Sequence, residues 1–120
     1  MRYAAGQVWA YRHRPGEEAS RLTILRVDAD PQHGWIVHIA VSGVAIKSPH
    51  APDGYLRHIG HLPLTEVALD ASVTALVETQ PPPPAGDGYA TWREAFDGGE
   101  GGVFIVPLDQ LIDMLEEATS

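Results

Sequence analysis

Histidines are the side chains of this chain best suited to chemistry at neutral pH, and none of the six lies beyond position 61. Imidazole nitrogens bind Zn²⁺ or Ni²⁺ and also serve as general bases. His58 and His61 are three residues apart, and with His50 they could offer three nitrogens to one metal ion. No carboxylate or cysteine completes a known ligand pattern, and Gly60 and Pro63 favour a loop here. The alternative is that these are ordinary loop histidines bonded to backbone or water.

His38 stands in a different setting, in the middle of the apolar segment Trp35–Val41. It is either a buried, hydrogen-bonded side chain, which we favour, or a residue on a functional sheet face. The candidate catalytic residues are therefore His38, His58 and His61. They carry one hypothesis for function, a small metal- or His-dependent hydrolase or nuclease that uses the histidine-bearing sheet and loop.

Other catalytic patterns are missing from the sequence. The chain has no cysteine, which excludes disulfides and thiolate sites, and Ser42 lacks the G-x-S-x-G turn of serine hydrolases. The glycine-rich Gly98–Gly102 has no phosphate-binding lysine, so we expect a hinge and no cofactor. Asp28 and Asp30 precede a turn, where carboxylates more often cap backbone N–H groups than bind cations.

Charge is distributed unequally along the chain. Positions 1–60 hold seven of the eight Lys and Arg and five of the sixteen Asp and Glu, whereas positions 61–120 hold one Arg and eleven acids. A net charge of −8 disfavours nucleic acid and anionic lipid as partners. The acids either keep the protein solvated or attract a basic protein partner. The residues expected to bind such a partner are Glu94, Asp97, Glu100, Asp113, Glu116 and Glu117.

Length and composition suit one domain over residues 1–120 with its own hydrophobic core. No apolar segment reaches the roughly 20 residues that span a bilayer, and Met1–Ser20 contains no signal-peptide core. We therefore expect a cytoplasmic protein.

The first part of the chain, residues 1–47, is expected to be rich in strands. Gly6–Arg12 alternates as a strand does, Pro15 and Gly16 predict a type II turn, and Arg21–Asp28 returns as the second arm of a hairpin. Trp35–Val41 is dense in β-branched residues and is predicted to continue beyond a kink at Gly43.

The second part, residues 63–120, is expected to be rich in helices and to follow a loop at 48–62. Apolar spacing predicts helices over Leu64–Thr79 and Tyr89–Phe96, separated by a Pro-rich connector at 80–88. Val103–Val106 is predicted as a short buried strand, and Pro107 marks the start of a terminal helix. This order predicts an α+β fold: a three- to five-stranded antiparallel sheet, or a partly open SH3-like barrel, with two or three helices on one face.

Two resemblances accompany this fold. The opening pattern GQVWxYxxRPGEExxxLTIL, together with Ile59–Pro63 and Trp92–Asp97, resembles a family of small uncharacterised bacterial proteins, and this resemblance implies no mechanism. About 25 residues of the first hairpin are similar, as a fold, to the SH3-like barrels of plasmid-maintenance toxins that cleave RNA. The chain lacks an Arg-Pro immediately before the second strand and the basic surface of those toxins.

The sequence leaves two function classes open. The hypothesis that we favour is a protein-interaction protein without enzymatic activity, such as an immunity or antitoxin-like inhibitor that binds a basic partner. The alternative is the histidine-dependent hydrolase or nuclease.

Overall fold

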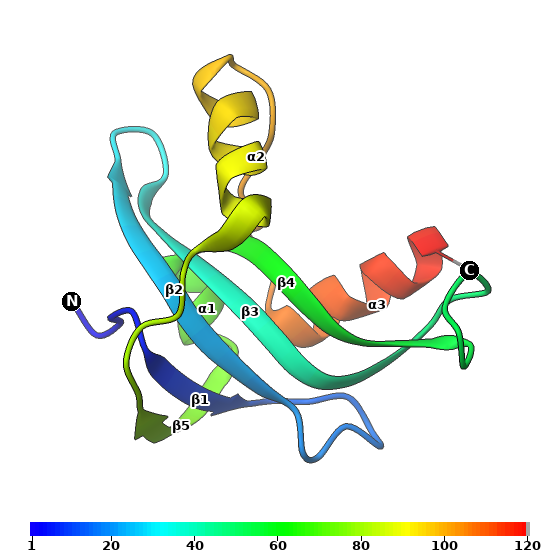
Figure 1. Cartoon of the computed structure of the whole chain (residues 1–120). Coiled ribbons are helices and arrows are strands. Elements are labelled where there is room, and N and C mark those ends of the chain that lie inside the picture. Colours follow the sequence, from blue (N-terminus) through cyan, green and yellow to red (C-terminus); the bar gives the residue numbers. More distant parts are fainter. Residues whose placement is uncertain (120) are drawn as a thin grey trace.

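The structure is a computed structural model that describes residues 1–119, built around a five-stranded antiparallel sheet in the order β4-β3-β2-β1-β5 (Figure 1). The strands are β1 (Gln7–Tyr11), β2 (Arg21–Asp30), β3 (Gly34–Lys47), β4 (Tyr55–Thr65) and β5 (Val73–Thr79). The helices are α1 (Glu66–Asp70), α2 (Gly86–Asp97) and α3 (Leu108–Thr119). The predicted α+β class with an antiparallel sheet is confirmed.

The first hairpin has the predicted turn. The carbonyl of Arg14 accepts a hydrogen bond from the N–H of Glu17 at 3.0 Å, and Gly16 between them has a φ of 86°. This is the positive φ that the third position of a type II turn requires and that glycine adopts without strain. The predicted kink in β3 also occurs, because Gly43 has a φ of 76° and a Cβ there would lie 2.9 Å from the Cα of Ser20.

The predicted loop at 48–62 is wrong in its second half, because β4 begins at Tyr55. Pro63 argued against a strand, since proline cannot donate a hydrogen bond to a sheet. β4 is an edge strand, however, and edge strands tolerate proline. The carbonyl of Pro63 accepts a hydrogen bond from the N–H of Phe104 at 2.9 Å.

The helix predicted over Leu64–Thr79 is also wrong. Only α1 is helical, with Thr65 as its N-cap accepting a hydrogen bond from the N–H of Ala68 at 3.2 Å, and Val73–Thr79 forms β5 beside β1. The β-branched residues Val73, Thr74, Val77 and Thr79 suit a strand, and pairing with β1 decides the outcome. The predicted strand at 103–106 is reduced to one isolated parallel bridge between Leu64 and Phe104.

The hydrophobic core lies on one face of the sheet, where α1 and α3 cover it. The strands contribute alternate residues to this core: Trp9, Tyr11, Leu22, Ile24, Val37, Ile39, Val41, Leu62 and Leu64. The helices add Leu69, Leu108, Leu111 and Ile112. The buried hydroxyl of Ser72 accepts a hydrogen bond from the N–H of Leu108 at 2.8 Å and so caps the start of α3.

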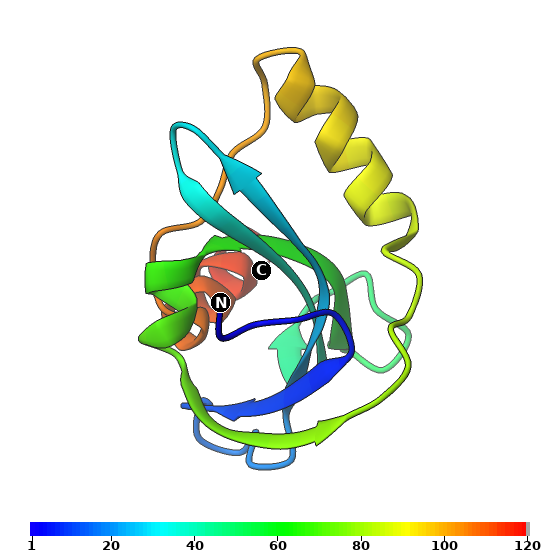
Figure 2. The same ribbon diagram turned by 90° about the vertical axis from the view of Figure 1, so that its left-hand side faces the viewer.

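The third helix, α2, lies on the opposite face of the sheet from α3 (Figure 2). It has the predicted stripe of Tyr89, Trp92 and Phe96, and it ends at the predicted Gly98-Gly99 pair. None of its residues is fully buried, so its attachment to the sheet depends on a small number of contacts. These contacts surround His38 and His61.

Candidate functional site

An irregularity between β3 and β4 decides which histidines share a face. Ile59 and Leu62 are three residues apart but pair with residues only two apart in β3, so β4 contains a bulge between them. In a regular strand His58 and His61 would face opposite sides. The bulge instead brings both to the wall of one groove, on the face that α2 covers.

His38 is the centre of a hydrogen-bonded chain of three side chains. Its own side chain is fully buried. Nε2 of His38 lies 3.0 Å from Oδ2 of Asp28, and Nδ1 lies 2.9 Å from Nε2 of His61. The two imidazole planes differ by only 16°, which suits a hydrogen bond in the plane of both rings. The chain therefore runs from Asp28 in β2 through His38 in β3 to His61 in β4.

The carboxylate of Asp28 is held in its ionised form. Burial alone would raise its pKa, but hydrogen bonds from Arg26 Nε at 2.8 Å and the Tyr89 hydroxyl at 3.0 Å lower the pKa below its usual value. Arg93 of α2 adds a positive charge 3.8 Å from the same carboxylate. Asp28 is thus a hydrogen-bond acceptor at neutral pH.

This ionised carboxylate fixes both histidine tautomers. Burial lowers the pKa of His38 to about 4, and burial also lowers the pKa of His61, so both rings are neutral at pH 7. Because Asp28 can only accept, Nε2 of His38 carries the proton and Nδ1 is the acceptor. His61 must then donate from Nε2. Its Nδ1 is left with a lone pair and no hydrogen-bond partner among residues 1–119.

Aromatic side chains of α2 cover this chain. The rings of Tyr89 and Trp92 each lie with their centroids 4.7 Å from that of His38, and both meet it edge to face. Trp92 is fixed in turn by a hydrogen bond from its Nε1 to the carbonyl of Gly102 at 2.8 Å. The aromatic stripe therefore shields His38 from water, while His61 lies nearer the edge of the covered area.

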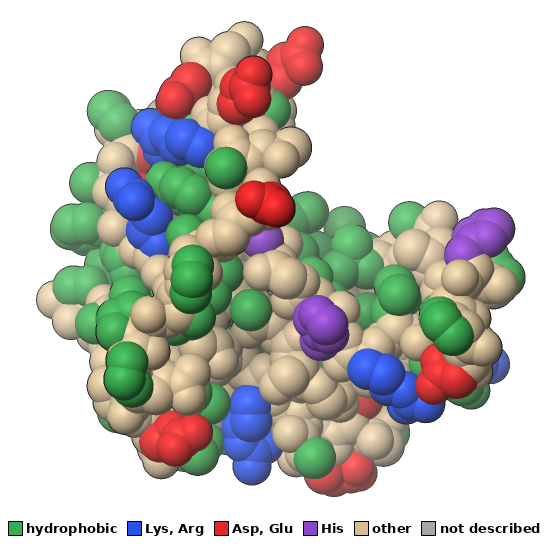
Figure 3. Space-filling model, in the orientation of Figure 1, with side chains coloured by type: hydrophobic (Ala, Val, Ile, Leu, Met, Phe, Trp, Pro, Cys, Tyr) green, Lys and Arg blue, Asp and Glu red, His purple; other side chains and the backbone are tan. Residues whose placement is uncertain are grey.

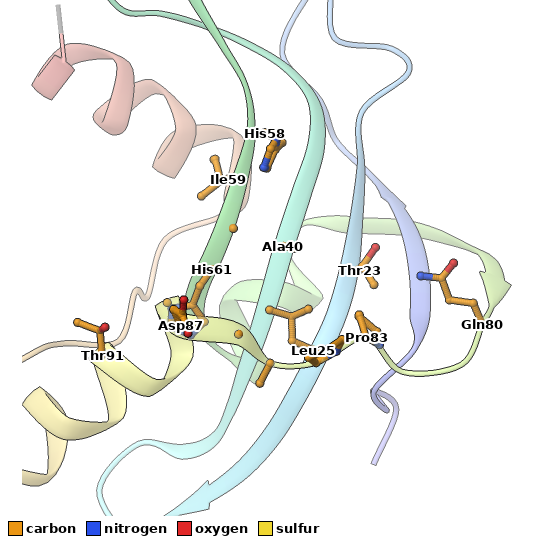
Figure 4. Close-up of a pocket in the computed structure, with 15 residues that line it drawn as sticks. Thr23, Leu25, Ala40, His58, Ile59, His61, Gln80, Pro83, Asp87 and Thr91 are labelled. Atoms are coloured by element: carbon orange, nitrogen blue, oxygen red, sulfur yellow. The ribbon is translucent and has the colours of Figure 1, made fainter. Parts of the chain in front are cut away.

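His61 opens onto a groove of about 920 Å³ between the sheet and the segment that leads into α2 (Figure 4). Leu25 and Ala40 contribute apolar wall from the sheet, and Pro83 contributes from the connector. Gly88, in the first turn of α2, is so close that a Cβ there would lie 2.8 Å from the Cβ of His61.

Residues at the start of α2 line the same groove as His61. Its N-cap, Ala85, makes no side-chain hydrogen bond to the helix. The N–H groups of the first turn, at 86–88, lack the intrahelical partners that later residues have. These N–H groups and His61 border the same groove.

The structure brings together two of the three predicted metal ligands and leaves the third apart. His58 and His61 line the groove, whereas His50 is exposed in the loop at 48–54. Within residues 1–119, no three His, Cys, Asp or Glu side chains are placed to hold a metal ion. The groove is therefore not a three-histidine metal centre.

Of Asp28 and Asp30, which were both expected to cap backbone N–H groups at a turn, only Asp30 does so. Asp30 accepts hydrogen bonds from the N–H groups of Gln32 and His33, as predicted for a turn. Asp28 does not cap a turn, because β2 continues through it to Asp30 and its side chain binds His38. Asp28 and Arg26 alternate along β2, and this alternation was the only sequence signal that Asp28 binds His38. Nothing in the sequence linked Tyr89 to Asp28.

The six acidic residues expected to bind a partner are divided between opposite faces of the sheet. Glu94, Asp97 and Glu100 lie at the end of α2, where Figure 3 shows exposed acidic side chains at the top of the molecule. Asp113, Glu116 and Glu117 belong to α3. They do not form one surface.

Two of the α3 acids have an internal role. Arg14 Nη1 lies 3.1 Å from Asp113 and 3.2 Å from Glu116, and Arg14 also binds the buried carboxylate of Glu17 at 2.9 Å. The hairpin tip thus makes an ionic contact with α3 through Arg14.

No family model, curated protein or solved structure matches the chain. None of the helices within residues 1–119 combines the length and the apolar character needed to cross a membrane. Function therefore has to be argued from the site alone.

Proposed function

We propose that this protein is a small hydrolase in which Nδ1 of His61 is the general base. The observation that carries the proposal is the chain Asp28–His38–His61, which leaves a neutral imidazole with a free lone pair at the wall of a groove. A general base works best when it is unprotonated at the working pH and close to the group whose proton it takes. Burial, which lowers the pKa of His61, provides the first of these conditions.

The reaction follows from the positions of these groups. Nδ1 of His61 takes a proton from a water molecule in the groove, and the resulting hydroxide attacks the carbonyl carbon of a bound acyl group. The N–H groups at the start of α2 border the same space and can donate to the oxyanion that forms. The imidazolium then returns its proton to the leaving alcohol or amine, which restores His61.

His38 and Asp28 are positioning residues in this scheme. When His61 gains a proton, its positive charge is stabilised through the hydrogen bond to His38 and, beyond it, by the carboxylate of Asp28. Losing a positioned general base typically costs about 10²- to 10⁴-fold in rate. Losing a carboxylate that acts through a second histidine should cost less.

The residues of the groove favour acyl substrates over nucleic acid. No Lys or Arg lines it, and Asp87 contributes a negative charge. Phosphodiester cleavage needs cations to hold the phosphate and neutralise developing charge. A nuclease at this site is therefore disfavoured, although the sequence left that alternative open.

The first test uses p-nitrophenyl hexanoate, a neutral ester of a length suited to the groove. We expect His61→Gln to lower kcat about 100-fold or more, and Asp28→Asn to lower kcat with little change in KM. The exposed His50→Gln serves as the matched control and should leave both constants unchanged. Hydrolysis by the wild-type protein that His61→Gln does not reduce would reject the proposal, as would no hydrolysis above background.

A second candidate is the interaction protein that binds a basic partner. The observation that favours it is the end of α2, where Glu94 and Glu100 are exposed and Asp97 pairs with Arg93 of the same helix, at 3.2 Å. The residues that would carry the interaction are thus reduced to the α2 half of the set expected from the sequence.

A further inference from the structure

The groove beside His61 combines apolar walls with a single acidic residue. Asp87 is the only acidic residue among those that line it, and no Lys or Arg lines it. Thr23, Gln80 and Thr91 contribute neutral polar groups. A ligand that matches this groove carries no negative charge of its own.

Asp87 is available to a ligand. It is exposed in the first turn of α2, and its carboxylate makes no hydrogen bond or ion pair with another side chain in residues 1–119. Its neighbour Gly88 abuts His61, and Figure 4 shows Asp87 and His61 on the same side of the groove. The positive end of α2 would attract anions, but the carboxylate of Asp87 opposes that attraction.

The remaining walls suit a hydrocarbon chain. Leu25 and Ala40 line the groove from the neighbouring strands β2 and β3, and Pro83 and Pro84 line it from the connector. Burying methylene groups against such surfaces is favourable in proportion to the area removed from water. A ligand that fills the groove therefore combines an apolar chain with a group that Asp87 can bind.

We propose that the groove takes acyl substrates whose chain ends in a protonated amine, and that Asp87 is the residue that selects them. This inference rests on the proposed hydrolase activity, because His61 supplies the chemistry. Asp87 contacts the ammonium group and takes no part in proton transfer. Since Asp87 is exposed, its pairing with an amine is worth only a modest factor, about two- to fivefold in affinity. The net charge of −8 adds a long-range attraction that salt screens.

Binding is measured first, with three ligands that cannot be hydrolysed and differ only at one end: hexylamine, hexan-1-ol and hexanoate. NMR titration of the backbone amides of His61 and Gly88 reports the Kd for each. We expect hexylamine to bind about two- to fivefold more tightly than hexan-1-ol, and hexanoate to bind most weakly. Asp87→Asn should remove the preference for the amine, and Asp87→Glu should retain most of it.

Hydrolysis is measured next, with the p-nitrophenyl esters of 6-aminohexanoate, hexanoate and adipate. In the wild-type protein we expect kcat/KM to be highest for the 6-aminohexanoate ester and lowest for the adipate ester. In Asp87→Asn we expect the three values to become similar. Amine-selective binding without hydrolysis would support the inference while rejecting the hydrolase. Equal binding of the three ligands, or a preference that survives in Asp87→Asn, would overturn the inference even if His61-dependent hydrolysis were found.

Discussion

At the scale of single residues, the main feature is a histidine with no exposed surface. Burying a polar ring is costly unless its nitrogens have partners, and His38 has one on each side, Asp28 and His61. Sequence reasoning treated a buried histidine and a functional histidine as alternatives. In the structure, the bonds that make burial of His38 tolerable also orient His61.

Burial of His38 predicts a loss of stability in acid. Its pKa is about 4 in the folded protein and about 6.5 when unfolded, so the unfolded chain gains the proton first as pH falls. The stabilisation is complete above pH 6.5 and is lost between pH 6.5 and about 4. Urea unfolding should show a decrease of about 2 kcal/mol in the free energy of unfolding between pH 7 and 4.5.

Two variants separate this effect from general acid sensitivity. His38→Asn should lower stability at pH 7 and remove most of the decrease between pH 7 and 4.5, whereas His50→Gln should keep the wild-type pH dependence. Burial also lowers the pKa of His61, so His61 adds to the decrease in the same direction. The lowered pKa of Asp28 acts only as pH falls below the ordinary aspartate value of 3.8, outside this window. A decrease of equal size in His38→Asn would mean that another group carries it.

At the scale of elements, the first hairpin and α3 are joined by the side chain of Arg14. Glu17 is buried, receives two bonds from Arg14 at 2.9 and 3.0 Å, and accepts a third from the N–H of Ala45 at 2.7 Å. Arg14 continues to Asp113 and Glu116 on α3. The tip of the hairpin is therefore a structural contact.

This contact predicts unequal costs for two substitutions. Glu17→Ala leaves Arg14 with a side chain only 13% exposed and without its main partner, and it should cost about 3 kcal/mol in the free energy of unfolding. Asp113→Ala removes a partner that is 68% exposed and should cost less than about 1 kcal/mol. Thermal unfolding of both variants measures the difference, and similar costs would contradict the assignment of Glu17 as the central partner.

Local patterns in the sequence were sufficient for some elements. The Pro15-Gly16 turn, the strand through Trp35–Val41 and the helix with Trp92 each depend on neighbouring residues, and all three were predicted. β5 was missed because its apolar residues also fit helical spacing, and only its pairing with the remote β1 decides between the two.

The site itself depends on sheet register, which the sequence does not reveal. His38 and His61 were both named as candidates, but their contact requires β3 to pair with β4 and the bulge before Leu62. Asp28 joins them only because β2 lies beside β3, and Tyr89 only because α2 folds back over the sheet. Each of these relations links residues far apart in the chain.

At the scale of the whole molecule, the excess of acid in the second half of the chain does not make one acidic surface. Glu66 and Asp70 lie in α1 and Glu78 lies in β5. The others lie in or just after α2 and in α3, on opposite faces of the sheet, and α3 uses Asp113 and Glu116 to bind Arg14. The end of α2 is left as the acidic feature with the fewest internal contacts.

Matched charge reversals test whether this end attracts a basic partner. We expect Glu94→Lys/Glu100→Lys to weaken binding of an octalysine peptide about three- to tenfold at low salt, because local attraction is lost. Glu66→Lys/Glu78→Lys changes the net charge equally elsewhere and should have a smaller effect. Fluorescence anisotropy at 20 and 200 mM salt measures both variants. Equal weakening by both pairs would show that net charge alone is responsible and would remove the α2 end as a docking site.

The central claim is that Asp28 and His38 leave Nδ1 of His61 unprotonated at the wall of the groove. Long-range ¹H–¹⁵N NMR correlation of the histidine rings at pH 7 measures this directly, because it distinguishes protonated from unprotonated ring nitrogens without any substrate. We predict that His38 and His61 are both neutral, each with its proton on Nε2, and that Asp28→Asn disturbs this pattern. A His61 ring that is charged, or protonated on Nδ1, would contradict the account.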